Sequence, residues 1–178
     1  MRSCFPRTGG TAPDAPPFVT LGEIRPEEGA VLEDLIADID LQWGRDMELL
    51  STQDLVEVDP DRHGSRHVAR LVIRSLRDRL DRFPVSFNVY DDGAFPAVTA
   101  LFNCRNGRTA RNHAEGMMVV EMLLDQPVRL GESVSVEFEM VVKEMGDVTD
   151  GVDRGVLRRT RELYLEVAFD PEDLPTWV

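Results

Sequence analysis

The sequence predicts a mainly β protein: an antiparallel β-sandwich of immunoglobulin-like type, with about 6–8 strands and one N-terminal amphipathic helix. Two observations predict this class. Apolar and polar residues alternate along several segments after about residue 54, and Gly, Pro, Asn and Asp separate these segments at near-regular spacing. The length of 178 residues is typical of one domain with some decoration.

The first third of the chain differs from the rest. Residues 1–17 are rich in proline and glycine and predict a flexible arm. Residues 18–53 are expected to form a helical extension, and residues 54–178 the sandwich domain. A helix is expected over 27–43, with Pro26 and the acids after it suited to its first turn. Apolar residues recur there at helical spacing: Leu32, Leu35, Ile36, Ile39 and Trp43.

Two segments alternate clearly enough to predict half-buried strands with one inward face each. The first inward face consists of Val134, Val136, Phe138, Met140 and Val142, and the second of Leu163, Leu165, Val167 and Phe169. Further strands are expected at 83–91, 97–105 and 117–125, with a shorter one at 55–58.

Residues 66–82 leave two structures open. On a helical wheel, Arg66, Arg70, Arg74 and Arg77 group on one side, which favours a helix. The preceding loop, "DPDRHGS", suits a β-hairpin and favours a strand instead.

The stretch "LFNCRNGRTARNH", residues 101–113, contains the main candidate site. Asn106 and Gly107 predict a type I′ turn, because both central positions of that turn require positive φ. The candidate ligand-binding residues are Arg105, Arg108, Arg111 and His113. Planar guanidinium groups bind carboxylates and phosphates through paired hydrogen bonds. The alternative is that these arginines pair with acids on the surface.

Two other groups of residues are candidates for chemistry. Cys104 lies beside arginines that favour a thiolate nucleophile, but the alternation places it on the inward face, which favours a buried core residue. His63 and His67 are four residues apart, with Asp59 and Asp61 nearby as oxygen donors. Two histidines in a glycine-containing loop are more often a solvated surface, so no metal site is expected. The sequence predicts no cofactor.

Composition restricts the class of partner and the compartment. The net charge of −13 opposes direct nucleic-acid binding, which requires a basic surface. Neither a secretory leader nor an apolar span is present, so no membrane association is expected. Two cysteines are too few for a disulfide framework, which indicates a reducing, cytoplasmic setting.

Four segments together resemble a known family: "RLVIRSLRDRLDRF", "LFNCRNGRTARN", "VVEMLLDQPVRLGESVSVEFEM" and "RELYLEVAFDPEDLPTWV". In this order they are similar to the C-terminal region of actinobacterial Xre-type helix-turn-helix regulators. These regulators carry a DNA-binding domain before that region, whereas residues 18–54 contain no paired short helices with a basic recognition face. The resemblance implies the effector-binding or partner-binding half of a regulator, without its DNA-binding function.

The expected function is therefore a non-catalytic, regulatory module that binds a protein partner or a small-molecule effector, with a homodimer as one possible assembly. The alternative is a small enzyme of secondary metabolism, because a sandwich or barrel cavity can position a substrate. A polar cavity lined by Tyr90, Arg105 and His113 would favour the enzyme. A flat apolar patch near Trp43 would favour the binding module.

Overall fold

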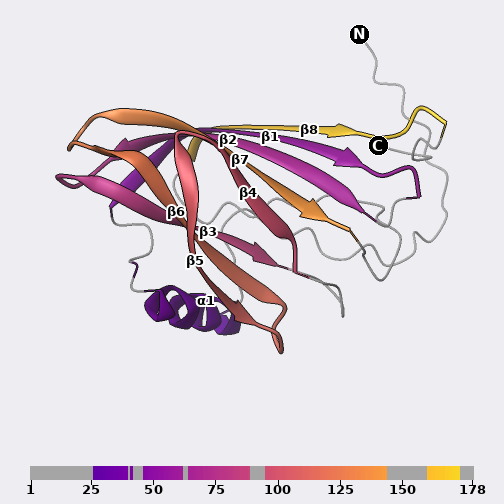
Figure 1. Cartoon of the computed structure of the whole chain (residues 1–178), viewed down its shortest axis with the longest axis horizontal. Coiled ribbons are helices and arrows are strands. Elements are labelled where there is room, and N and C mark those ends of the chain that lie inside the picture. The colour runs from indigo at the N-terminus through magenta and orange to yellow at the C-terminus, as the bar shows by residue number, and fades with distance from the viewer. Residues whose placement is uncertain are drawn as a thin grey trace, which may run out of the picture.

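The computed structural model describes residues 26–39, 41, 46–61, 64–88, 95–143 and 160–172. Within them lie one helix and eight strands (Figure 1). Their bounds are α1 Pro26–Asp38, β1 Met47–Val58, β2 Ser65–Ser75, β3 Leu80–Asn88, β4 Ala97–Phe102, β5 Cys104–Asn112, β6 Met117–Val128, β7 Ser133–Val142 and β8 Thr160–Ala168.

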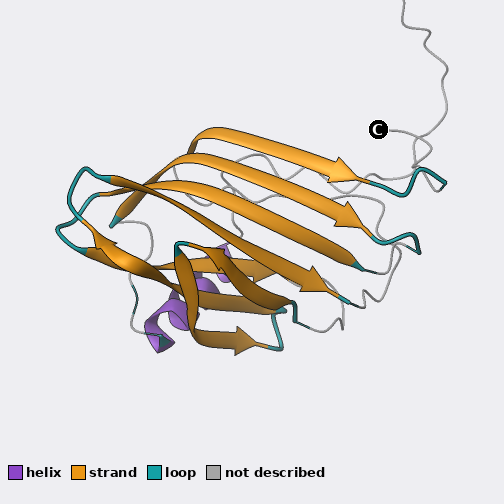
Figure 2. Cartoon of the chain, turned by 45° about the horizontal axis from the view of Figure 1, so that its top comes forward, coloured by secondary structure: helices purple, strands orange, loops and turns teal. Residues whose placement is uncertain are grey.

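The strands form two packed sheets, which confirms the predicted β-sandwich with one helix. The large sheet has the order β4-β7-β2-β1-β8 and the small sheet the order β3-β6-β5. In Figure 2 the long strands of the large sheet lie above the small sheet. Neighbouring strands are antiparallel except that β8 runs parallel to β1.

The main core lies between the two sheets. Ile73 and Val136 come from the large sheet, and Phe83, Met118 and Met122 come from the small sheet. All five side chains are almost completely buried. Burial of this apolar surface is the main term that holds the two layers together.

The helix α1 covers the opposite face of the small sheet. Four of its predicted apolar residues are buried, namely Leu32, Leu35, Ile36 and Ile39. They pack against Met117 and Val119 of β6 and Ala110 of β5 (Figure 1). The helix therefore packs on its own sandwich, and β6 is buried on both faces. It ends at Asp38, and Trp43 lies outside the described residues.

The first strand is longer than expected. β1 begins at Met47, so residues 47–53, expected within the helical extension, are strand. A bulge between Leu49 and Ser51 shifts the period-two pattern, and the buried faces of Thr52 and Asp54 are polar. Because of these two features, residues 47–53 lack the apolar alternation that predicts a strand.

The open segment 66–82 is not helical: it contains most of β2, a turn and the start of β3. β1 and β2 form the hairpin that the loop predicted, closed by a 3.0 Å hydrogen bond from the Asp59 amide to the Gly64 carbonyl. Three of the four arginines that group on a helical wheel, Arg66, Arg70 and Arg74, lie instead on the outer face of β2. Arg66 binds Glu57 and Glu139, and Arg70 binds Glu137, each at 2.9 Å from Nε or Nη1.

The last strand has the predicted inward face, but this face is not buried. Leu163 pairs with Thr52 of β1, which in turn pairs with the core residue Leu71 of β2. Leu163 and Leu165 are 43% and 38% exposed. β8 is the edge of the large sheet, and none of its residues belongs to the core cluster between the sheets. Alternation predicted the strand but not its position in the sheet.

The remaining expectations about the N-terminal arm, residues 1–17, fall outside the described residues. In the part of the chain that is described, no helix has both the length and the apolar character needed to cross a membrane.

Candidate functional site

Asn106 and Gly107 do not form the predicted type I′ turn. They lie inside β5, where the register with β6 shifts between Asn106 and Thr109. At this β-bulge Gly107 and Arg108 together oppose Glu121, the residue between Val120 and Met122 in the ladder. The prediction was wrong because Gly107 is used for space rather than for positive φ.

The turns around β5 lie at other residues. Asn103, with φ of 55°, separates β4 from β5 and moves the chain from the large sheet to the small one. Its side-chain amide donates to the Ser135 carbonyl at 2.8 Å, and its own carbonyl accepts from the Asp125 amide at 3.2 Å. Asn103 thus connects both layers. Gly116, with φ of 60°, lies in the turn before β6.

Asn106 binds the backbone of the neighbouring sheet. Its Oδ1 accepts from the Ala100 amide at 3.0 Å, and its Nδ2 donates to the Val98 carbonyl at 2.6 Å. The side chain therefore satisfies two backbone groups of β4 in place of another strand.

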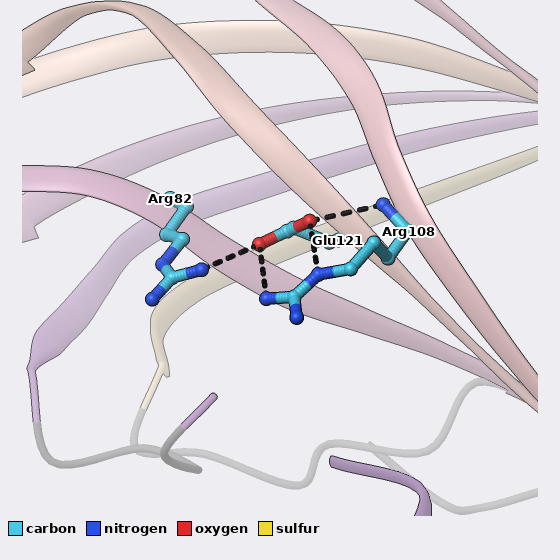
Figure 3. Close-up of polar contacts among 3 residues, drawn as sticks. All are labelled: Arg82, Arg108 and Glu121. Carbon is cyan, nitrogen blue, oxygen red and sulfur yellow. Dashed lines mark hydrogen bonds and ion pairs between the residues drawn. The ribbon is translucent and has the colours of Figure 1, made fainter. Parts of the chain in front are cut away.

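Glu121 is a buried carboxylate, only 3% exposed, between two arginines (Figure 3). Arg108 donates to it from Nε and Nη2, both at 3.2 Å, and from its backbone amide at 2.9 Å. Arg82 on β3 donates from Nη1 at 3.0 Å. The three residues link all three strands of the small sheet. The carboxylate also accepts a hydrogen bond from the Arg108 backbone amide, which lies in the bulge, outside the strand ladder.

Competing effects set the pKa of Glu121. Burial raises the pKa of the carboxyl, but hydrogen bonds from the Arg108 side chain and backbone and from Arg82 outweigh burial and lower it below the usual value. Glu121 is therefore ionised in the folded protein at neutral pH.

This lowered pKa predicts a pH-dependent contribution to stability. A depressed folded pKa stabilises the protein above the unfolded pKa, and the contribution is lost as pH falls through the folded value. We expect the stability difference between wild type and Glu121→Gln to be largest near neutral pH and to shrink below about pH 4.5. Urea unfolding followed by circular dichroism across this range measures it, and a constant difference would contradict the assignment.

Gly107 leaves room for the Glu121 side chain. A Cβ at this position would lie 2.4 Å from Glu121 Oε2, 2.8 Å from Cγ and 2.9 Å from Cδ. The glycine is therefore required by a close approach.

Gly107→Ala is expected to destabilise the fold by about 1–2 kcal/mol, because the carboxylate must move away from its donors. In a Glu121→Ala background the same change should cost close to nothing, since the clashing atoms are absent. Urea unfolding of the four proteins of this double-mutant cycle measures the coupling. Equal costs in both backgrounds would show that the glycine serves another purpose.

Arg105 lies on the same face of the small sheet as this ion-pair group. Leu123 on β6 pairs with Arg105 of β5 on one side and with Arg82 of β3 on the other. The Arg105 side chain is exposed and makes no hydrogen bond or ion pair with a described residue. Because the bulge adds one residue, Arg105 and Arg108 share this face although three positions separate them. We call Arg82, Arg105 and Arg108 the arginine cluster.

Arg111 and His113 belong to a different place. The Arg111 guanidinium carbon lies 5.9 Å from the ring centroid of Phe95, and the His113 ring packs edge-on against Phe95 at 4.9 Å. Arg105 and His113 are at opposite ends of β5, on the order of 25 Å apart at the rise of an extended strand. The four predicted site residues thus divide into two pairs.

Cys104 is the buried core residue that the alternation favoured. Its Sγ lies 3.5 Å from the Glu137 carbonyl. Burial raises the pKa of the Cys104 thiol, and the Asp125 charge raises it further. A thiol protonated at neutral pH is a poor nucleophile.

The Cys104 environment predicts slow thiol chemistry. In a Cys4→Ser variant, where Cys104 is the remaining cysteine of the sequence, reaction with an aromatic disulfide reagent is expected to be at least about a hundredfold slower in the folded protein than in urea. Absorbance of the released thiolate follows both rates. Similar rates in the two conditions would indicate an accessible, activated thiol.

Sequence reasoning missed Arg82, Glu121 and Phe95. Glu121 is the one charged residue within the apolar run "MMVVEMLL", and a buried charge requires a partner. That signal points to a buried ion pair but not to its partners, which come from other strands. No group of three metal-ligating side chains occurs among the described residues. His63 is outside them, and His67 shares a 3.1 Å hydrogen bond with Ser65.

The fold and the site together define a helix-covered β-sandwich with an arginine cluster on the outer face of its small sheet. No protein-family model and no curated protein matches the sequence. Among solved structures, the chain is similar to part of an M1 zinc metallopeptidase from Deinococcus radiodurans, with 19% identity and a TM-score of 0.39 over 58% of this chain. A two-domain M1 zinc metallopeptidase mutant bound to L-tryptophan gives 21% identity and a TM-score of 0.40 over 65% of this chain. The chain spans only 21% and 24% of those two chains.

Proposed function

We propose that this chain is a non-catalytic, regulatory binding module that recognises a small anionic effector, a carboxylate or a phosphate, at the arginine cluster. The observation that carries the proposal is the exposed Arg105 beside the Arg82–Glu121–Arg108 group. Arg82 and Arg108 both donate to one buried carboxylate, and the exposed Arg105 lies on the same face of the sheet, in a chain whose net charge is −13.

The ion pair with Glu121 supports recognition by holding Arg108 in place. Its guanidinium donates to the carboxylate through both Nε and Nη2. Preorganised donors lose less conformational entropy on binding than mobile ones. Arg105, whose side chain makes no ion pair with a described residue, then supplies the charge that binds the anion at this face.

The chemistry of the buried groups supports binding over a reaction. The Cys104 thiol is protonated, and the Glu121 carboxylate is ionised and surrounded by donors. A general acid or base needs a pKa near the working pH, which neither group has. Arg105 and His113, expected to line one cavity in an enzyme, lie at opposite ends of β5. The resemblance to the effector half of Xre-type regulators supports the regulatory character and the cytoplasmic setting.

Isothermal titration calorimetry with inorganic phosphate and with citrate tests this function. Arg105→Ala is expected to weaken binding about tenfold, the value of one charge-assisted hydrogen bond. Arg129→Ala, which removes an exposed arginine from the β6–β7 turn, is the matched control and should bind as wild type. If both variants weaken anion binding equally, the binding depends on overall charge alone, and a defined anion site at Arg105 is contradicted.

A further inference from the structure

The edges of the two sheets are protected unequally. At the β4 edge, the Asn106 side chain occupies the Val98 carbonyl and the Ala100 amide. In the small sheet, β3 contains Pro84, which has no amide proton, and β5 carries the bulge. Prolines and bulges are the devices by which proteins block further strand pairing.

The β8 edge has none of these devices. Its nine residues include no proline, and its register with β1 runs without a shift from Thr160 to Ala168. No described strand pairs with its other side. Three large side chains in its centre are exposed: Leu163 at 43%, Tyr164 at 61% and Leu165 at 38%.

The two faces of β8 differ in chemistry. Leu163 and Leu165 lie on the face of Thr52 and Asp54, whereas Glu162 and Glu166 lie on the face of Ser51 and Leu55. A strand added beside β8 would place one set of its alternate side chains against leucines and the other set against carboxylates.

We propose that β8 is a docking edge for an extended segment of a protein partner, in which apolar residues alternate with lysine or arginine. Backbone hydrogen bonds along β8 supply affinity, and the alternating side chains supply register. The net charge of −13 attracts such a basic segment over a longer range. This surface is separate from the arginine cluster, so the inference goes beyond the anionic effector.

A second copy of the chain suits this edge less well. In a symmetrical antiparallel pair that places Leu163 opposite Leu165 of the second copy, Glu162 lies opposite Glu166 of the second copy. Like charges directly opposed destabilise a strand pair, and two chains of the same net charge repel.

Fluorescence anisotropy with the full chain and a labelled nine-residue peptide of alternating lysine and valine tests the docking edge. The peptide is expected to bind. A version with alternate backbone amides N-methylated keeps every side chain but cannot extend a sheet, and it should bind at least about tenfold more weakly. If both peptides bind equally, simple charge attraction explains the binding and the proposal is overturned.

Charge variants separate this edge from the rest of the acidic surface. Glu162→Lys with Glu166→Lys is expected to weaken the peptide about tenfold, whereas the exposed control pair Glu33→Lys with Glu115→Lys, with the same change in net charge, should weaken it less than about twofold. Arg105→Ala should leave peptide binding unchanged, so failure of the effector site and failure of this edge are distinguishable. Sedimentation as a dimer that Leu163→Glu converts to a monomer would assign the edge to a second copy and overturn the proposal.

Discussion

Phe83→Ala is expected to lower the free energy of unfolding by about 4 kcal/mol, the largest loss expected from one substitution in this protein. Phe83 is 2% exposed and lies opposite Met122 in the β3–β6 register, within the core between the sheets. Removing its ring leaves a cavity in the core between the two sheets, which the surrounding strands do not close. Urea unfolding followed by circular dichroism measures the change.

Phe102→Ala is the matched control for Phe83→Ala. The same ring is removed, but Phe102 is 55% exposed at the end of β4. We expect a cost below about 0.5 kcal/mol, as for surface substitutions generally. Comparable losses for the two variants would mean that the core does not lie between the sheets as described.

Glu121→Ala is expected to destabilise the protein by about 2–3 kcal/mol. The change leaves the Arg108 backbone amide and two guanidinium groups without their acceptor in the small sheet. Loss of one partner of a buried ion pair costs about 3–5 kcal/mol, and the partial exposure of both arginines reduces this value. Thermal and urea unfolding measure it.

Glu57→Ala serves as the comparison for Glu121→Ala. It removes a carboxylate from Arg66 in an ion pair of the same 2.9–3.0 Å length, but both side chains are about half exposed. The expected cost is below about 1 kcal/mol. If Glu57→Ala lowers the free energy of unfolding as much as Glu121→Ala does, burial is not the reason that the Arg82–Glu121–Arg108 group stabilises the fold.

Much of the fold could be predicted because period-two and period-3.6 patterns report burial directly. The apolar face of α1 is buried as its pattern predicts, and in β7 Val136 and Phe138 are buried on the predicted inward face. The pattern was less informative where burial is polar, as at Thr52 and Asp54, or where a strand lies at an edge, as in β8. Alternation gives the faces of one strand, whereas position in a sheet depends on neighbours distant in sequence.

The candidate site shows the same limit. The sequence identified Arg105 and Arg108 by residue type, and the structure gives them one face through the bulge at Gly107 and Arg108. An Asn-Gly pair can form a turn, in which the glycine has positive φ, or the glycine can leave space for a neighbouring side chain. The local sequence does not distinguish these two roles. The deciding atom group is the Glu121 carboxylate, which comes from the next strand.

The strand order of the two sheets has a consequence for how the chain folds. Strands β1, β2, β4, β7 and β8 form one layer and β3, β5 and β6 form the other, so the chain crosses between layers after β2, β3, β4 and β6. Neither layer is a continuous piece of the chain. Such interleaving gives a high contact order, which slows folding to milliseconds or longer. Neither layer completes its strand pairing before the chain has crossed to the other, so the sandwich assembles as one cooperative unit.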